Sequence, residues 1–203
     1  MIRGSQGYTE QAPELIARYE SIPFEYKHAE LMHLFPPVPA MVLDIGAGTG
    51  ADAAWLALEG HEVCAVEPTE AFRNFGESRH ASPRIQWIDD CLPRLDRVVQ
   101  RSRCYDLILL TAVWMHLDEH ERQQAMPVLA SVLAPGGILV MAVRHGPVPQ
   151  GRTMFDVPAE ETIALAEANG LSCILSIHTE SRLAENREAG VTWSRLAFRQ
   201  ARS

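Results

Sequence analysis

Lysine is almost absent from this sequence of 203 residues: Lys27 is the only one, and the other basic side chains are arginines that form no basic run. The formal net charge is -8 at pH 7. A protein that binds nucleic acid through its phosphates concentrates positive charge on one surface. The composition therefore argues against a nucleic-acid partner and favours a small molecule.

The sequence also lacks long apolar runs and paired cysteines. No stretch approaches the ~18 apolar residues of a membrane-spanning helix, and the first residues, MIRGSQGYTE, have no apolar core of a signal peptide. None of the four cysteines forms a C-x-x-C pair, and no cluster of Asp, His and Glu has the spacing of metal ligands. These absences predict a cytoplasmic protein without a catalytic metal.

Short apolar runs alternate with helix-like segments along most of the chain, which predicts a parallel sheet with crossover helices. The last two strands follow each other with only a loop between them, which predicts an antiparallel pair. Strands are expected at 41–45, 62–66, 85–88, 106–112, 137–144, 171–178 and 191–199, and helices at 51–59, 69–78, 119–133 and 158–168.

Residue chemistry at the helix ends supports these boundaries. Asp118 and Glu121 have the spacing of a capping box, and Pro158 suits the first turn of a helix. Gly60 and the pair Asn169-Gly170 suit C-terminal caps.

The length suits one domain. Residues 10–35 have apolar positions at mixed helical spacing, broken at Pro23 and closed by PPVP. We divide the chain into a helical N-terminal cap, residues 1–39, and a main domain, residues 40–203. Only a short loop follows the fifth expected strand, so the N-terminal segment is expected to cover the ligand.

A glycine-rich turn, VLDIGAGTG, follows the first expected strand. Gly46, Gly48 and Ala51 have the spacing of the dinucleotide fingerprint in its G-x-G-x-x-A form. Asp44 favours another ligand, because a carboxylate is unfavourable beside a pyrophosphate in a cleft of low dielectric and favourable beside an ammonium group. S-adenosylmethionine carries an ammonium group and a sulfonium but no phosphate. Glu67, after the second strand, suits the ribose hydroxyls of either ligand class.

The segments VLDIGAGTG, VCAVEP, IQWIDDCLP, YDLILLTAVWMHL and LAPGGILVMAV, in this order and spacing, resemble the motifs of the Rossmann-like (class I) S-adenosylmethionine-dependent methyltransferases. The resemblance covers roughly residues 40–145. It implies an α/β three-layer sandwich with a seven-stranded, mostly parallel sheet whose last strand is antiparallel. It also implies S-adenosylmethionine as cofactor, S-adenosylhomocysteine as product, and methyl transfer to oxygen or nitrogen of a small molecule. No N/D-P-P-Y/F segment or Pro-Cys is present, so direct methylation of DNA is not expected.

The resemblance implies roles for individual residues. Asp44 would face the amino group of the cofactor, and Glu67 would bind its ribose. Either Asp89 or Asp90 would accept a hydrogen bond from the adenine amine, while the backbone amide of Cys91 contacts the ring. The expected cofactor-binding set is Asp44, Gly46, Ala47, Gly48, Gly50, Glu67, Pro68, Asp89, Asp90, Cys91 and Thr111.

Candidates for the acceptor side follow the fourth and fifth strands, at the edge where open α/β sheets bind ligands. Trp114 and His116 follow the fourth strand, and Arg144 and His145 follow the fifth, so all four are expected to face the cleft. His116 and His145 are candidate general bases, the alternative for His116 being a histidine that holds the next helix. Arg144 and the nearby Arg152 suit a carboxylate or phosphate, the alternative being solvated arginines. The expected substrate-binding set is Trp114, Arg144, His145 and Tyr19.

Two other interpretations stay open. A nicotinamide-dependent oxidoreductase of the same fold would need a glycine turn that tolerates a pyrophosphate, which Asp44 opposes. A non-catalytic module could bind the cofactor for regulation or assembly.

Overall fold

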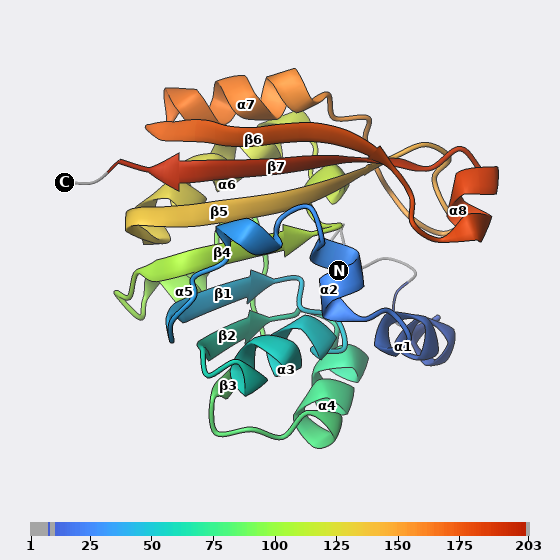
Figure 1. Ribbon diagram of the computed structural model, residues 1–203, viewed down its shortest axis with the longest axis horizontal. Coiled ribbons are helices and arrows are strands. Elements are labelled where there is room, and N and C mark those ends of the chain that lie inside the picture. Colours follow the sequence, from blue (N-terminus) through green and yellow to red (C-terminus); the bar gives the residue numbers. More distant parts are fainter. Residues whose placement is uncertain (1–7, 9–10, 202–203) are drawn as a thin grey trace.

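A sheet of seven strands, in the order β3-β2-β1-β4-β5-β7-β6, runs through the protein in the computed structural model, which describes Tyr8 and residues 11–201 (Figure 1). β7 is antiparallel to both of its neighbours, and the other strand pairs are parallel. The predicted seven-stranded Rossmann-like sheet with an antiparallel last strand is confirmed. The strands are β1 (Met41–Ile45), β2 (Glu62–Val66), β3 (Ile85–Ile88), β4 (Tyr105–Thr111), β5 (Leu133–His145), β6 (Leu171–Glu180) and β7 (Thr192–Gln200).

Helices lie on both faces of this sheet. They are α1 (Ala12–Glu20), α2 (Phe24–His28), α3 (Ala51–Leu58), α4 (Glu70–Arg79), α5 (Asp96–Val99), α6 (Glu119–Val132), α7 (Ala159–Ala168) and α8 (Ala184–Glu188), with short 3-10 helices η2 (Met32–Leu34) and η3 (Trp114–His116). The short helices α5 and α8 were not predicted, and α8 occupies the connection between β6 and β7 that was expected to be a plain loop. Pro158 is the N-cap of α7 and lies just outside its first turn.

Alternating side chains of the strands build a core on each face of the sheet. In β4, Ile108 and Leu110 pack in a cluster with α6 and α7, while Leu107 and Leu109 pack in a second cluster with α2 and α3. All four are fully buried. A central parallel strand covered on both faces accounts for the unbroken apolar run LILL.

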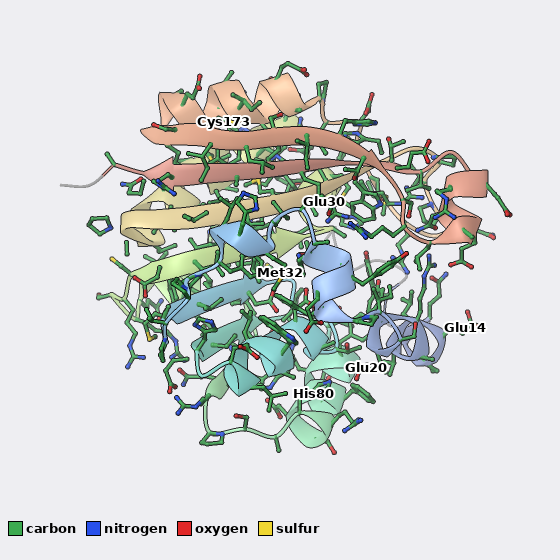
Figure 2. The ribbon with its side chains drawn as sticks, in the orientation of Figure 1. Glu14, Glu20, Glu30, Met32, His80 and Cys173 are labelled. Carbon is green, nitrogen blue, oxygen red and sulfur yellow. The ribbon has the colours of Figure 1, made fainter. Side chains whose placement is uncertain are left out.

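The N-terminal segment folds back over the sheet. Phe24 stacks on Trp55 of α3 with ring centroids 4.0 Å apart, which fixes α2. Glu20 accepts a hydrogen bond from His80 at 3.1 Å, which joins α1 to α4 (Figure 2). As a result α1 lies beyond the carboxyl ends of the parallel strands, on the side of the molecule where α8 also lies (Figure 1).

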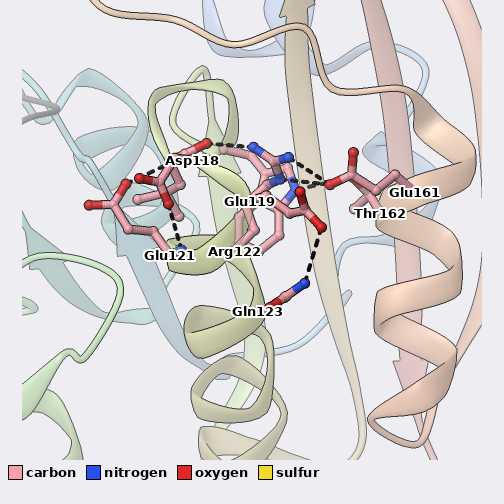
Figure 3. A network of polar contacts seen from close by, with 9 residues as sticks. Asp118, Glu119, Glu121, Arg122, Gln123, Glu161 and Thr162 are labelled. Carbon is pink, nitrogen blue, oxygen red and sulfur yellow. Dashed lines mark hydrogen bonds and ion pairs between the residues drawn. The ribbon is translucent and has the colours of Figure 1, made fainter.

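The segment between β4 and α6 is held by a polar network (Figure 3). Asp118 and Glu121 each accept a hydrogen bond from the other's backbone amide at 2.9 Å, which confirms the predicted capping box. The buried guanidinium of Arg122 donates to the Leu117 carbonyl at 2.6 Å and to Glu161 at 2.7 and 2.9 Å. This network fixes the residues that follow β4 next to α7.

No helix in the described part of the chain is long and apolar enough to cross a membrane.

Candidate active site

A cavity of about 720 Å³ lies at the carboxyl ends of the parallel strands. Its walls come from the turn after β1, the segments after β2, β3 and β4, helix α1 and the region of α8. Open α/β sheets bind ligands at this edge. The expected residues that line it are Asp44, Gly46, Ala47, Gly48, Glu67, Pro68, Asp90, Cys91, Thr111, His116, Arg144 and Tyr19.

Glycines with positive φ angles form the turn between β1 and α3. The φ angles of Gly46, Gly48 and Gly50 are +71°, +56° and +82°. A Cβ atom on Gly46 would lie 2.4 Å from a methyl carbon of Val113, so only glycine fits there without movement. Gly50 is the N-cap of α3 and packs against Trp87, away from the cavity lining, so its contact with a cofactor stays a prediction.

We predict that Gly46→Ala lowers the free energy of unfolding more than Gly190→Ala does. Both glycines are left-handed, with φ of +71° and +75°, but nothing lies within 4 Å of the Cβ position at Gly190. The left-handed backbone alone costs an alanine about 1–2 kcal/mol, or about 2–8 °C in melting temperature. Gly46→Ala adds the clash with Val113. Equal melting temperatures of the two variants would show that Val113 moves aside without cost.

Asp44 is a buried carboxylate with an unused oxygen. It lies one residue before the end of β1, is 2% exposed, and its Oδ2 has no hydrogen-bond partner among the described residues. Burial raises the pKa of Asp44 to about 8, and the nearby carboxylates of Asp52 and Glu67 add to the increase. Such a group favours binding of a cation, because a positive charge would offset both the cost of burying the carboxylate and its repulsion by the neighbouring carboxylates.

Asp52 is paired, in contrast to Asp44. Lys27 donates to its Oδ1 at 2.7 Å, and His28 contacts its Oδ2 at 2.9 Å. Burial alone would raise the pKa of Asp52, but Lys27 and His28 lower it below its ordinary range. Nothing in the sequence around Lys27 indicates this ion pair. Only the packing of α2 on α3 brings these residues together.

Glu67 is oriented by backbone amides. Its Oε2 accepts from the amide of Gly48 at 2.9 Å and its Oε1 accepts from the amide of Thr69 at 2.7 Å. Burial raises the pKa of Glu67, and these amides oppose the increase. Each carboxylate oxygen can accept a second hydrogen bond, so Glu67 can still bind two hydroxyl groups in the cavity.

The structure separates the two aspartates after β3. Asp90 lines the cavity, whereas Asp89 lies outside it and pairs with Arg73 at 3.3 Å. The carboxylate of Asp90 accepts from the amide of Cys91 at 2.9 Å and from two amides of α5. The Cys91 amide therefore already donates to Asp90, and its contact with an adenine ring stays a prediction. Asp90 keeps one open acceptor position on Oδ1.

His116 has a defined tautomer. Its Nδ1 lies 2.7 Å from the carbonyl oxygen of Thr153, so Nδ1 carries the proton. Its Nε2 is then the acceptor for the hydroxyl of Tyr8, which lies 3.0 Å away. Burial lowers the pKa of His116; the Thr153 carbonyl opposes this, and nearby arginines lower the pKa further. The lowered pKa favours the neutral imidazole of His116 at the cavity wall.

The family model described as "Methyltransferase domain" matches residues 42–137, the part of the chain that carries the glycine turn, Asp44, Glu67 and β4. This part of the chain is a methyltransferase domain of the S-adenosylmethionine-dependent class.

Relatives and solved structures agree with this assignment. The methyltransferase is 27% identical over 160 residues to an uncharacterized methyltransferase of Oceanobacillus iheyensis, covering 78% of this chain and 68% of that protein. It is 28% identical over 134 residues to trans-aconitate 2-methyltransferase of Azoarcus sp., covering 66% of this chain and 51% of that enzyme. Its fold is similar to that of 1,6-didemethyltoxoflavin-N1-methyltransferase of Burkholderia thailandensis, with a TM-score of 0.71 at 19% identity over 96% of this chain and 84% of that one.

The cavity suits S-adenosylmethionine. The unpaired oxygen of Asp44 can accept from an ammonium group, and the two oxygens of Glu67 can accept from ribose hydroxyls. Among the described residues, no group of three or more His, Cys, Asp and Glu side chains could hold a metal ion.

Two residues of the methyltransferase do not face the cavity as expected. Trp114 is fully buried in the core, where its indole nitrogen donates to Thr162 at 3.0 Å. His145 contacts the hydroxyl of Ser194 at 2.8 Å and does not line the cavity. The geometry therefore gives no support to Trp114 as a substrate-binding residue or to His145 as a catalytic or substrate-binding residue, and neither is carried into the proposed site.

Other residues of the cavity wall belong to no motif of the sequence. They come from segments distant in sequence, and the contacts that bring them together depend on the tertiary fold. Trp193 and Arg195 alternate along β7 and therefore face the same side, which is the only sequence signal among them. The unexpected lining residues include Arg18, Lys27, Glu185, Asn186, Trp193 and Arg195.

Proposed function

We propose that this methyltransferase transfers the methyl group of S-adenosylmethionine to oxygen or nitrogen of a small molecule. The observation that carries the proposal is the buried carboxylate of Asp44, whose Oδ2 is unpaired beside the glycine turn. A carboxylate in that position favours an ammonium group and disfavours the pyrophosphate of a nicotinamide cofactor.

The proposed binding roles follow the geometry. Asp44 accepts from the cofactor's ammonium group, Glu67 accepts from the ribose hydroxyls, and Asp90 lies at the adenine end of the cavity. Tyr19, which is 3.7 Å from the Cβ position of Gly48, covers the glycine turn, so we assign it to the cofactor end of the cavity.

When bound, the cofactor supplies a methyl group on a sulfonium, which is an excellent leaving group. The protein has to align the acceptor, exclude water and take a proton where the acceptor carries one. His116 is the proposed base, because its Nε2 lone pair faces the Tyr8 hydroxyl at the cavity wall. An acceptor would displace that hydroxyl. The segment of residues 1–39 is the proposed cover, since α1 contributes Leu15 and Tyr19 to the cavity wall.

Several features support a small acceptor. The cavity of about 720 Å³ also has to hold the cofactor, and the net charge of -8 disfavours nucleic acid. Two relatives are named for methylation of small molecules, trans-aconitate and glycine. All four cysteines are free, which supports a reducing compartment such as the cytoplasm.

Titration calorimetry with S-adenosylhomocysteine, S-adenosylmethionine and NAD tests the cofactor assignment. We expect micromolar binding of the first two and none of NAD. Binding of NAD alone would favour the oxidoreductase interpretation. Binding of S-adenosylmethionine without turnover of any acceptor would favour the non-catalytic module.

We predict that binding of S-adenosylhomocysteine releases about one proton at pH 7. The pKa of Asp44 is raised to about 8 in the empty cavity, so the group is mostly protonated at pH 7, and an ammonium group lowers that pKa. The release should decrease as the pH rises past 8. Calorimetry at one pH in buffers of different ionisation enthalpy measures it. Asp44→Asn should release no proton, and release that is independent of Asp44 would contradict this account.

A further inference from the structure

Arginine side chains in the wall of the cavity suggest a property of the unidentified acceptor. Five basic side chains line the cavity: Arg18, Lys27, Arg144, Arg152 and Arg195. Three of them have acidic neighbours. Lys27 pairs with Asp52 at 2.7 Å, Arg18 pairs with Glu185 at 2.8 Å, and Arg195 lies 3.8 Å from Glu30.

Arg144 and Arg152 differ, because neither forms an ion pair with a described residue. Arg144 donates to the carbonyl oxygen of Pro147 at 2.8 Å. Arg152 donates to the side chain of Gln11 at 3.0 Å and stacks over the ring of Tyr8, 3.6 Å from its centroid. The Nε of Arg152 is buried without a partner among the described residues. Both guanidinium groups thus line the same cavity, and their hydrogen-bond donors are only partly used.

The positive charges of these two arginines repel each other. An anion bound between them would offset this repulsion. Burial lowers the pKa of Arg144, and the positive charges of Arg18 and Arg152 lower it further. A guanidinium binds a carboxylate through two parallel hydrogen bonds, and such charge-assisted bonds are stronger than neutral ones.

The arginines are joined to the proposed base. Thr153, next to Arg152 in the chain, accepts from Nδ1 of His116, and Tyr8 links the Arg152 face to Nε2 of the same ring. A carboxylate held here would place the rest of a small molecule beside His116. The glycine turn and Asp44, which bind the cofactor in the proposed function, belong to other segments of the cavity wall.

We propose that the methyl acceptor is a small carboxylic acid whose carboxylate is anchored by Arg144 and Arg152, with the accepting hydroxyl or amine directed toward His116. This proposal rests on the proposed function. In the reaction the acceptor oxygen or nitrogen forms the new bond to the methyl carbon, the bond from that carbon to sulfur breaks, and the acceptor proton passes to Nε2 of His116.

The test uses the full chain saturated with S-adenosylhomocysteine and follows thermal unfolding. The probes are glycolate, benzoate, succinate and trans-aconitate, each against its matched amide, together with inorganic phosphate. We expect at least one acid to raise the melting temperature by about 5 °C and its amide to have no effect. Arg144→Gln and Arg152→Gln should remove that shift, while the exposed control Arg199→Gln keeps it. If a Gln variant fails to fold, Arg144→Lys and Arg152→Lys replace it, and they should weaken the shift because lysine lacks the two-point contact.

Each contrary result has a separate meaning. Failure of S-adenosylhomocysteine to bind the unmodified protein counts against the proposed function. Normal S-adenosylhomocysteine binding with no shift from any acid, with equal shifts from acid and amide, or with a shift from phosphate only, overturns the carboxylate proposal. So does a loss of S-adenosylhomocysteine affinity in the arginine variants, because the arginines would then bind the cofactor's own carboxylate.

Discussion

Asp44→Asn is expected to weaken binding of S-adenosylhomocysteine by at least about 30-fold and, at alkaline pH, to make the empty protein more stable. Removing one member of a buried ion pair costs about 2–5 kcal/mol, and here the carboxylate is 2% exposed with an oxygen reserved for a ligand. The amide has nearly the same shape, so the cavity should keep its form.

The gain in stability follows from the raised pKa of Asp44. An acid whose pKa is higher in the folded protein destabilises it once the pH exceeds the value in the unfolded chain, and the penalty grows until the pH passes the folded value of about 8. Asp44→Asn removes this penalty. The melting temperature of the variant should therefore exceed that of the unmodified protein at pH 8.5, and the gain should disappear near pH 4.

Asp89→Asn is the matched control, because Asp89 lies outside the cavity and pairs with Arg73. It should bind S-adenosylhomocysteine as the unmodified protein does. Full cofactor affinity in Asp44→Asn would contradict the assignment of this carboxylate to the ammonium group.

Most of the fold could be predicted because it depends on local patterns. The run LILL in β4 is buried on both faces, so its sequence indicates a central parallel strand without knowledge of its neighbours. The capping box of Asp118 and Glu121 fixes the start of α6 from four residues. Helix α5 escaped prediction because its start depends on the carboxylate of Asp90, several residues upstream.

Two of the residues predicted for the acceptor side lie away from the cavity for a geometric reason. Trp114 and His116 lie in one 3-10 helix, where residues two apart point in different directions, so they could not both face the cavity. Arg144 and His145 are successive residues of β5, where side chains alternate between faces. In each pair, therefore, one side chain must point away from the cavity. Which member faces the cavity depends on packing against Thr162 and Ser194, which are distant in sequence.

The positions of the remaining residues in the cavity wall are set only by tertiary contacts. Lys27 reaches Asp52 because the aromatic stack of Phe24 on Trp55 fixes α2. The hydroxyl of Tyr8 hydrogen-bonds to His116, which lies 108 residues further along the chain. The periodicity of the sequence does not indicate such contacts. The residues of this part of the cavity could therefore not be predicted from the sequence.

His116→Gln is expected to lower kcat by about 100–10,000-fold, the usual contribution of a general base, with affinity for S-adenosylhomocysteine changed less than about threefold. Glutamine can keep hydrogen bonds to Thr153 and Tyr8, which hold the ring of His116 at 2.7 and 3.0 Å, but it cannot take a proton. The variant therefore separates the chemistry of the ring from its structural contacts. Once an acceptor is identified, kcat and KM from initial rates provide the measurement.

The pH profile distinguishes a base from a residue that only holds its neighbours. Burial lowers the pKa of His116, so the unmodified enzyme should keep its activity below the ordinary histidine value of about 6.5 and lose it as the pH falls through the lowered pKa. That acidic limb should be absent in His116→Gln. Tyr8→Phe leaves the imidazole of His116 in place and removes only the hydroxyl that hydrogen-bonds to it. This variant should therefore retain the acidic limb of the pH profile. A variant His116→Gln with normal kcat would assign His116 to holding the loop of Thr153, because its contacts would then account for the residue without proton transfer.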